Sequence, residues 1–265
     1  MKSKKVFAAM LCAICCIIVV LIGCESEGVA REVIRRSEGV TREEVVREAA
    51  FYGKRWLVIG DSISESNFHT QKNYHTYVSE WLHMEVVNVA ASGTGFNYAF
   101  QGNGGWLSEM ENYPVDIDII TIMGGLNDRH YAVGAYGDET EHTFYGSLKL
   151  FFDKLIEKYP NTPIGVITST PRLYCWGERG EYVEHINAVI TMSGEYSLPV
   201  LDLYRSSGLR PWNEDNNKEY FSHIDSTTQR KNETGDGVHL NDKGHLLVAY
   251  KVYDFMLANL IPTAK

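Results

Sequence analysis

Residues 57–64 of the chain read LVIGDSIS, a short apolar run that ends on glycine, aspartate and serine. An apolar run bounded by turn residues is typical of a buried strand in a sheet that is covered on both faces. A serine directly after such a strand can cap the next helix, and it can also be a nucleophile held at the end of the sheet. The rest of the chain has to distinguish these two interpretations.

Strand-like and helix-like segments alternate from Lys54 onward. The strand-like segments are residues 56–60, 85–90, 117–123, 164–168 and 199–203. Helical spacing of apolar residues occurs over 74–82, 143–159 and 181–193, and in a last helix capped by Asn241 or Asp242. This alternation predicts an α/β domain with five parallel strands and helices on both faces. Two long connections, residues 95–113 and 204–235, have the length that is usual for functional or mobile loops.

The N-terminal residues have the order of a secretory signal. Lysines at positions 2, 4 and 5 precede an apolar run over residues 6–23, and Cys24 follows. The string Leu21-Ile22-Gly23-Cys24 resembles a bacterial lipobox, which implies cleavage before Cys24 and attachment of lipid to that cysteine. The alternative is an uncleaved membrane anchor, because an apolar run of 18 residues can just span a bilayer.

Both interpretations place the domain outside the cytoplasm and tether it to a membrane through the N-terminus. We expect residues 1–23 to be a lipoprotein signal peptide, residues 24–50 a charged tether and residues 51–265 the folded domain. Within the tether, the spacing Thr41-Arg42-Glu43-Glu44 is typical of a capping box and predicts a short helix that ends near Ala50.

Charge and cysteine content exclude several classes of protein. The segment before Cys24 holds three lysines and no acids, so the remaining chain carries 22 basic and 34 acidic residues, a net charge of −12. Such an excess of acid argues against nucleic acid as a partner. Beyond Cys24 only Cys175 remains, so no internal disulfide is expected, and Cys175 is interpreted as a small core residue.

Polar residues follow the first three strand-like segments and precede the last helix. Ser62 follows the first segment, Gly93 follows the second and Asn127 the third, while Asp236 and His239 stand directly before the helix. Because ligands bind at the carboxyl ends of parallel strands, we expect these residues to meet at one edge of the sheet.

These residue types are the ones that acyl transfer requires. A serine hydroxyl is a weak nucleophile until a base takes its proton, and His239 can be that base. Asp236 can fix the imidazole tautomer and stabilise its charged form. The backbone N–H groups of Ser62 and Gly93, with the side-chain amide of Asn127, can form an oxyanion hole.

The four blocks GDSIS (60–64), ASGTG (91–95), GGLND (124–128) and DGVHLN (236–241) together resemble those of the SGNH, or GDSL, hydrolases. The resemblance spans about residues 54–260. It implies a flavodoxin-like three-layer α/β/α fold and ester or acyl hydrolysis without a metal. It further implies that Ser62 is the nucleophile, that Gly93 and Asn127 are oxyanion donors, and that Asp236 and His239 complete the triad.

Several competing interpretations are weaker. The Asp-x-x-His spacing also occurs at Asp242 and His245, but that pair lies within the last helix, where Asp242 is better explained as its cap. We expect Asp61 to hold the serine turn by local hydrogen bonds, and Asp128 to cap a helix. The sequence has no complete dinucleotide loop, Walker loop, H-E-x-x-H zinc motif or G-x-S-x-G elbow, so we expect no cofactor and no metal.

The sequence does not identify the substrate. Aromatic residues of the long loops could pack within the protein or stack on a sugar: Phe96, Tyr98, Trp106, Tyr131, Tyr136, Trp176 and Trp212. We expect a short acyl ester, such as an acetyl group on a carbohydrate. The alternatives are a lipid-directed esterase or thioesterase, and a membrane-tethered glycan-binding lipoprotein without catalytic activity.

Overall fold

The computed structural model describes residues 42–98, 105–173, 182–225, 227–231 and 233–262. The chain divides into two compact units, Met1–Ala49 and Ala50–Lys265. The described part of the first unit is a helix, α3 (Arg42–Ala49), which agrees with the predicted short helix. Cys24, Cys175 and Trp176 lie outside the described residues.

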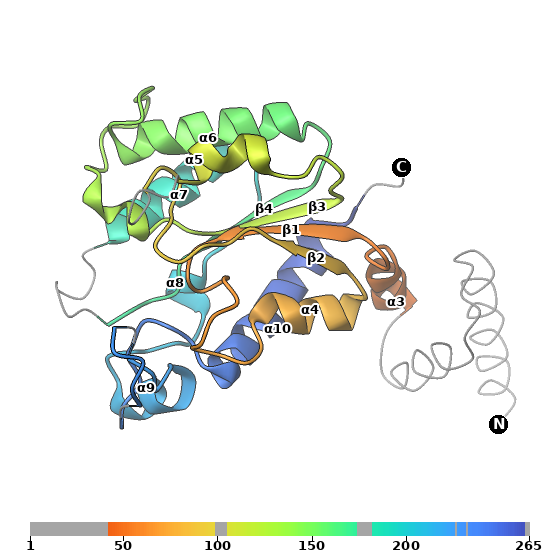
Figure 1. The fold of residues 1–265 in the computed structure, drawn as a ribbon. Helices are drawn as coiled ribbons and strands as arrows, with labels where there is room; N and C mark the ends of the chain where they lie inside the picture. The colour runs from red at the N-terminus through yellow and green to blue at the C-terminus, as the bar shows by residue number, and fades with distance from the viewer. Residues whose placement is uncertain (1–41, 99–104, 174–181, 226, 232, 263–265) are drawn as a thin grey trace, which may run out of the picture. The chain divides into compact units, whose positions relative to one another are not determined.

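In the second unit, five parallel strands form a sheet in the order β2-β1-β3-β4-β5 (Figure 1). The strands are β1 (Arg55–Gly60), β2 (Glu85–Asn88), β3 (Ile119–Gly124), β4 (Ile164–Thr168) and β5 (Val200–Leu201). This is the strand order of flavodoxin-like sheets. The predicted five-stranded parallel sheet is thus confirmed, and the topological switch point lies between the neighbouring strands β1 and β3.

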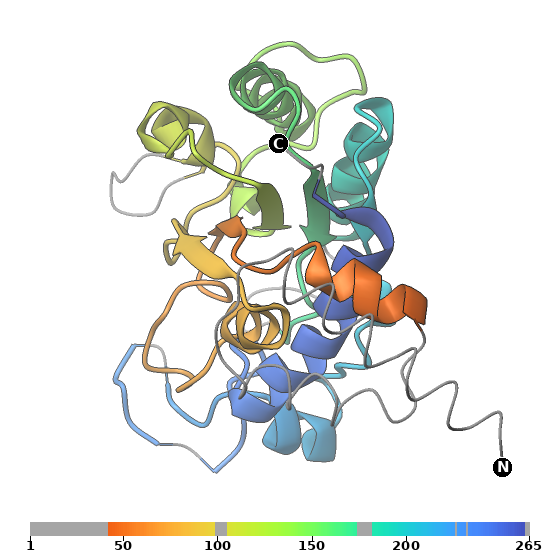
Figure 2. The same cartoon turned by 90° about the vertical axis from the view of Figure 1, so that its right-hand side faces the viewer.

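Helices cover both faces of this sheet (Figures 1 and 2). One face carries α4 (Tyr74–Leu82) and α10 (Asp242–Asn259). The opposite face carries α5 (Trp106–Glu109), α6 (Phe144–Lys158) and α7 (Val183–Glu195). The result is the three-layer α/β/α fold that the sequence predicts.

Alternation along the central strands builds the two cores. In β1, Trp56 and Val58 enter the core under α4 and α10, whereas Leu57 and Ile59 enter the core under the other helices. Successive side chains of a strand point to opposite faces, so a continuous apolar run is required where both faces are covered. The one polar side chain at the centre of β3, Thr121, accepts a hydrogen bond from the Trp56 indole at 2.9 Å.

Several element ends differ by a few residues from those predicted, and of the two residues predicted to cap the last helix, Asn241 is the cap. The last strand stops at Leu201 instead of residue 203, since the Asp202 carboxylate caps the short helix α8 (Leu203–Ser206). The cap of α10 is Asn241, whose side chain accepts the Gly244 N–H at 3.0 Å. Asp242 instead accepts the N–H groups of residues 71 and 72, at 2.7 and 3.2 Å.

The two long connections contain short helices that the sequence pattern did not predict. The first holds α5 and the 3-10 turn η2 (Met110–Asn112), and the second holds α8 and α9 (Glu214–Tyr220). A further 3-10 turn, η3 (Asn127–His130), follows β3. Residues 214–220 read EDNNKEY and offer no apolar periodicity to detect. Among the described residues, the helices lack the length and apolar character needed to cross a bilayer.

Candidate active site

Ser62 lies in a tight turn that directly follows β1. The Asp61 carboxylate accepts the Ile63 N–H at 3.0 Å, and the Asp61 carbonyl accepts the N–H groups of Ser64 and Glu65, each at 3.0 Å. The local role predicted for Asp61 is therefore confirmed. Gly60 is required by a close approach, because a Cβ there would lie 2.5 Å from the Ser64 hydroxyl. The turn leaves the Ser62 side chain partly exposed.

A buried polar network holds the turn from behind. The Ser64 carbonyl accepts hydrogen bonds from Asn73, Asn88 and His75, at 3.1, 2.9 and 2.9 Å. The Ser64 hydroxyl bonds the Tyr74 hydroxyl at 2.9 Å. A carbonyl can only accept, so the proton of His75 lies on Nε2. Burial lowers the pKa of His75 to about 4, which keeps this ring neutral at physiological pH.

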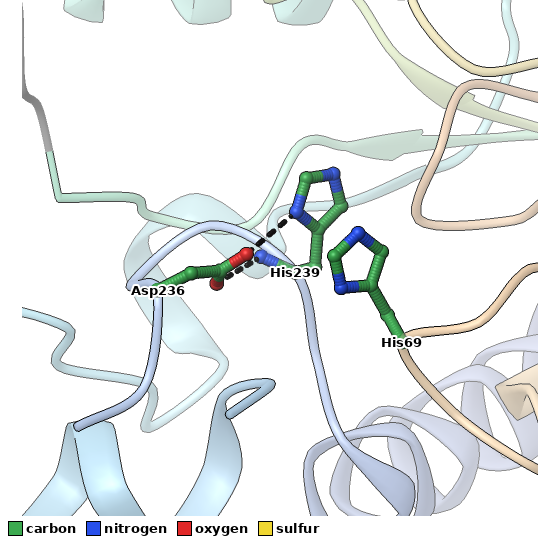
Figure 3. Close-up of side chains that lie close together, drawn as sticks. All are labelled: His69, Asp236 and His239. Atoms are coloured by element: carbon green, nitrogen blue, oxygen red, sulfur yellow. Dashed lines mark hydrogen bonds and ion pairs between the residues drawn. The ribbon is translucent and has the colours of Figure 1, made fainter. Parts of the chain in front are cut away.

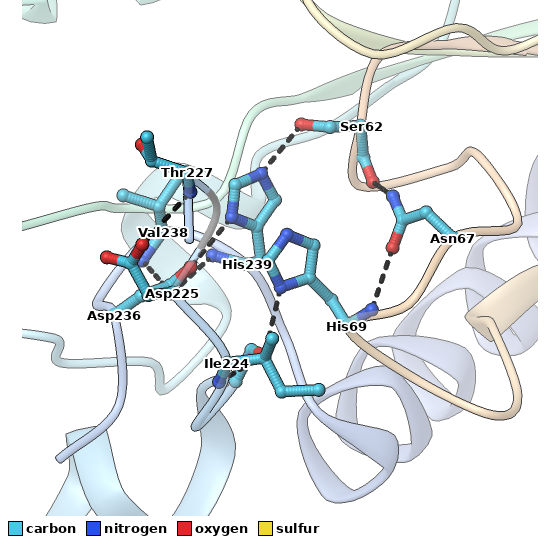
Figure 4. A network of polar contacts seen from close by, with 10 residues as sticks. Ser62, Asn67, His69, Ile224, Asp225, Thr227, Asp236, Val238 and His239 are labelled. Carbon is cyan, nitrogen blue, oxygen red and sulfur yellow. Dashed lines mark hydrogen bonds and ion pairs between the residues drawn. The ribbon is translucent and has the colours of Figure 1, made fainter. Parts of the chain in front are cut away.

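The structure brings Ser62, His239 and Asp236 into one hydrogen-bonded chain (Figure 4). The Ser62 Oγ lies 3.1 Å from His239 Nε2, and His239 Nδ1 lies 2.8 Å from Asp236 Oδ2. The side chains of His239 and Asp236 are 14% and 12% exposed, so the hydrogen bond between them is largely shielded from water but the site is not sealed. This is the geometry required for a base to take the serine proton while an acid orients the base.

The segment that carries Asp236 and His239 is fixed by its own backbone and by Ser222. The second carboxylate oxygen of Asp236 accepts the N–H groups of Val238 and His239, each at 2.9 Å. Ser222 donates its N–H to the His239 carbonyl at 2.8 Å and accepts the Asp236 N–H at 2.8 Å. Gly237 allows this tight loop with a φ of 69°.

The three predicted oxyanion donors come from segments that are tied together. The Asn127 amide donates to the Thr94 carbonyl at 2.9 Å and lies 3.5 Å from Asp61 Oδ2. Thr94 in turn follows Gly93, which has a φ of 75°, as expected for the predicted turn. Among the described residues, the N–H groups of Ser62 and Gly93 donate no hydrogen bond, so both can donate to a ligand.

Asp128 has a different role from the predicted helix cap. Its buried carboxylate accepts the N–H groups of Phe96, Asn97 and Tyr98, at 2.9, 2.9 and 3.0 Å, and so fixes the loop after Gly93. Burial raises the pKa of Asp128 to about 6, and the three backbone N–H groups oppose that rise. Gly95 is required here, since a Cβ at that position would collide with the carboxylate at 2.1 Å.

Several other candidates from the sequence do not enter the site. His245 is buried, and its Nδ1 accepts the Tyr74 N–H at 3.3 Å, so it is no rival to His239. Phe96 and Trp106 are buried in the core and cannot stack on a sugar, whereas Tyr136 and Trp212 are 59% and 42% exposed.

One residue beside the triad was not predicted from the sequence. The His69 ring lies parallel to the His239 ring, with centroids 3.9 Å apart and planes inclined by 5° (Figure 3). His69 belongs to none of the four blocks, and nothing in its sequence neighbourhood marks it out. Only the approach of two distant segments places it here.

His69, Asp236 and His239 also offer a set of potential metal ligands, with one atom from each residue within 4.8 Å of the others. Both ring nitrogens of His239 are already engaged, by Asp236 and by Ser62. His69 Nδ1 is bonded to Ser222 at 2.9 Å. A metal at this position would have to break the hydrogen-bonded chain, so the donor set fits proton transfer better than metal binding.

Comparison with known proteins identifies related sequences and folds. The family model described as "GDSL-like Lipase/Acylhydrolase family" matches residues 58–247, whereas no curated protein matches the chain. A protein from Lactobacillus plantarum is similar in structure with a TM-score of 0.67 and 25% identity, over 78% of this chain and 98% of that one.

Two further solved structures share the fold at lower identity. A possible lipase from Chitinophaga pinensis has a TM-score of 0.60 and 21% identity, over 77% of this chain and 97% of its own. A catalytic mutant of Axe2, an acetylxylan esterase from Geobacillus stearothermophilus, has a TM-score of 0.52 and 17% identity, over 81% and 98%.

Proposed function

We propose that this chain, which belongs to the GDSL-like lipase/acylhydrolase family, hydrolyses a short-chain carboxylic ester with Ser62 as its nucleophile. Family membership establishes the enzyme class, a serine hydrolase that acts on esters. One observation carries the assignment of residues: the chain from Ser62 through His239 to Asp236, with hydrogen bonds of 3.1 and 2.8 Å. Such a chain supplies both a base for the nucleophile and an acid that orients the base.

In the proposed reaction, Ser62 Oγ attacks the ester carbonyl while His239 Nε2 takes the hydroxyl proton. The N–H groups of Ser62 and Gly93 and the amide of Asn127 donate to the resulting oxyanion. His239 then gives its proton to the leaving alcohol, and the acyl group remains on Ser62. Water, activated by His239, attacks this acyl-enzyme, and the carboxylic acid leaves with Ser62 restored.

We further propose that the acyl group is acetyl and that the alcohol is a carbohydrate. The Axe2 structure, which shares this fold, is that of an acetylxylan esterase. Beside the triad, the ring of Phe68 is 43% exposed and lies 4.3 Å from that of His69, centroid to centroid. An exposed aromatic ring beside the ring that stacks on His239 can contact the C–H face of a sugar, which supports a carbohydrate alcohol.

The first test compares p-nitrophenyl acetate with the butyrate and octanoate esters, using the full chain purified in mild detergent. We expect hydrolysis to be fastest for acetate and to fall by about 10³-fold or more in Ser62→Ala, because the nucleophile is lost. The control is Ser79→Ala, a serine of α4 whose hydroxyl bonds, within the described part of the chain, the Thr76 carbonyl at 3.0 Å. This variant should match the wild type.

Each other outcome would contradict part of the proposal. Preference for octanoate would favour a lipid-directed esterase or thioesterase. Equal turnover by the wild type and Ser62→Ala would remove Ser62 from the mechanism. Binding of acetylated glycans without turnover of any ester would favour a glycan-binding lipoprotein. For an active enzyme, release of acetate from acetylated xylan then tests the carbohydrate assignment directly.

A further inference from the structure

The His69 ring covers one face of the catalytic base candidate. The two imidazoles are parallel within 5°, at a centroid separation of 3.9 Å (Figure 3). His69 is only 8% exposed, so this face of His239 is shielded from water. The proposed reaction uses the in-plane nitrogens of His239, which are bonded to Ser62 and Asp236, and it leaves the stacked face without a stated role.

His69 is held in place on two sides. The Asn67 side chain accepts the His69 N–H at 3.1 Å and donates to the Ser62 carbonyl at 2.8 Å, so it ties His69 to the nucleophile turn (Figure 4). Ser222 bonds His69 Nδ1 at 2.9 Å, and its backbone is paired with both Asp236 and His239. The stack is therefore fixed from both segments that carry the triad.

His69 stays neutral although it lies close to other titratable groups. Burial lowers the pKa of His69 to about 4, the neighbouring His239 contributes in the same direction, and Asp236 opposes them. On α10, burial lowers the pKa of His245, His239 and His69 contribute in the same direction, and Asp242 opposes them. Near pH 7 the face of His239 therefore meets an uncharged ring when His239 takes up the serine proton.

We propose that His69 is a positioning residue that holds the His239 ring in line between Ser62 and Asp236 by stacking on it. Rotation of the His239 ring about its Cβ–Cγ bond would separate it from both hydrogen-bond partners, and a parallel ring in contact opposes that rotation. The stack also keeps water from the ring face. This inference rests on the proposed function for the role of His239, and it adds a residue outside the four sequence blocks.

The test compares His69→Phe with His69→Ala in hydrolysis of p-nitrophenyl acetate. Phenylalanine keeps a flat ring but loses the hydrogen bond to Ser222, whereas alanine loses both. We expect kcat/KM to fall by about 10- to 100-fold in His69→Ala through a lower kcat, since a misplaced base slows the chemical step. His69→Phe should stay within about threefold of the wild type on the same scale.

The pH profile separates positioning from a purely structural role. In His69→Ala, water reaches the exposed face of His239 and solvates the imidazolium. The acid limb of kcat/KM should therefore move to higher pH by about half a unit or more. A residue that merely fills the core would lower thermal stability and leave this limb in place. His69→Phe keeps the face covered and should retain the wild-type limb.

The matched control is His83→Asn, which removes a histidine at the C-cap of α4, where φ is 54° and asparagine is tolerated. This variant should leave kcat/KM for p-nitrophenyl acetate and the acid limb of its pH profile unchanged. The proposal is overturned if His69→Ala keeps the wild-type kcat and acid limb, or if His69→Phe is as impaired as His69→Ala. If His69→Ala does not fold, the phenylalanine variant alone decides: a loss of tenfold or more overturns the proposal, and wild-type activity supports it.

Labelling of Ser62 by a fluorophosphonate distinguishes failure of the His69 proposal from failure of the proposed function. The rate of Ser62 labelling by a fluorophosphonate depends on the triad but not on the natural substrate. Slower labelling in His69→Ala supports the positioning role even where no ester tested is turned over. A wild-type chain that is not labelled at Ser62 would instead contradict the proposed function itself.

Discussion

In the proposed reaction, the amide of Asn127 donates to the oxyanion, a charge that forms only during the reaction. One bond, to the Thr94 carbonyl at 2.9 Å, fixes the amide, while the contact with Asp61 Oδ2 is long, at 3.5 Å. An amide nitrogen has two protons, so the second can turn to an oxyanion without breaking a strong hydrogen bond. Burial raises the pKa of the nearby Asp61, and the charge of Arg172 opposes this effect.

Asn127→Ala should therefore lower kcat for p-nitrophenyl acetate by about 10²- to 10³-fold, with little change in KM, since the lost donor acts mainly in the transition state. The measurement is steady-state kinetics on the purified variant. Asn112→Ala is the control, because the exposed Asn112 side chain bonds, among the described residues, the Glu109 carboxylate at 2.8 Å. A kcat within threefold of the wild type would remove Asn127 from the oxyanion hole.

Sequence motifs predicted which residues meet at the site, but not every role. Ser62, Asn127 and the Asp236–His239 pair all stand in short blocks with recognisable neighbours. Asp128 and Asp242 were assigned as helix caps, yet their carboxylates bind backbone N–H groups of other loops. The local sequence is the same whether an acidic side chain at a helix start caps that helix or binds N–H groups of another loop. Its partner therefore depends on which distant segment lies beside it in the fold.

At the level of elements, the connection from β1 to α4 depends on a neutral buried histidine. His75, in the first turn of α4, donates its Nε2 proton to the Ser64 carbonyl at 2.9 Å. Its pKa is about 4 in the folded protein, against an ordinary value of 6.5. The unfolded chain therefore binds more protons between these two pH values, and stability is lost as pH falls through that window.

His75→Gln tests this linkage, because glutamine keeps an N–H donor but does not titrate. Between pH 7 and pH 4.5, the free energy of unfolding of the wild type should fall relative to that of His75→Gln by about 2 to 3 kcal/mol. Urea unfolding at both pH values measures the difference. His142→Gln, at an exposed position, serves as the control and should track the wild type. A pH-independent difference between wild type and His75→Gln would contradict a neutral, buried His75.

The bounds of a helix could be predicted where its apolar side chains pack into the core at helical spacing. Helix α4 was predicted over the same residues that the structure shows, Tyr74–Leu82, because its buried side chains recur at helical spacing. Helix α9 was missed, since polar residues fill it and a cap at Asn213 starts it. Such helices depend on capping and on neighbouring loops, which leave little trace in the pattern of apolar residues.

For the whole molecule, attachment to a membrane through Cys24 remains a proposal. It rests on three lysines, an apolar run and the string Leu21-Ile22-Gly23-Cys24. The full chain, expressed in a bacterial host with radiolabelled palmitate, should incorporate label, and Cys24→Ser should not. Cys12→Ser, within the predicted signal peptide, is the control and should be labelled like the wild type. Membrane association without label, at the mass of the uncleaved chain, would indicate the alternative transmembrane anchor.

By itself, the sequence determined the fold class and the residues that lie together in the proposed catalytic centre. Apolar runs that alternate with amphipathic helices require a covered parallel sheet, and the carboxyl ends of such strands share one edge. Residues placed directly after β1 and β3 therefore meet whatever the details of the loops. This part of the prediction depends on local pattern and topology alone.

Only the tertiary structure decided how that centre is supported. The stack of His69 on His239, the pairing of Ser222 with Asp236 and His239, and the binding of residues 96–98 by Asp128 all join segments distant in sequence. No sequence motif indicates these contacts, because a ring face can stack on, and a carboxylate can hydrogen-bond to, whichever neighbour lies against it in the folded protein. The physical reason is that hydrogen bonding and ring stacking act over a few ångströms, so their partners exist only once the sheet and its loops have closed.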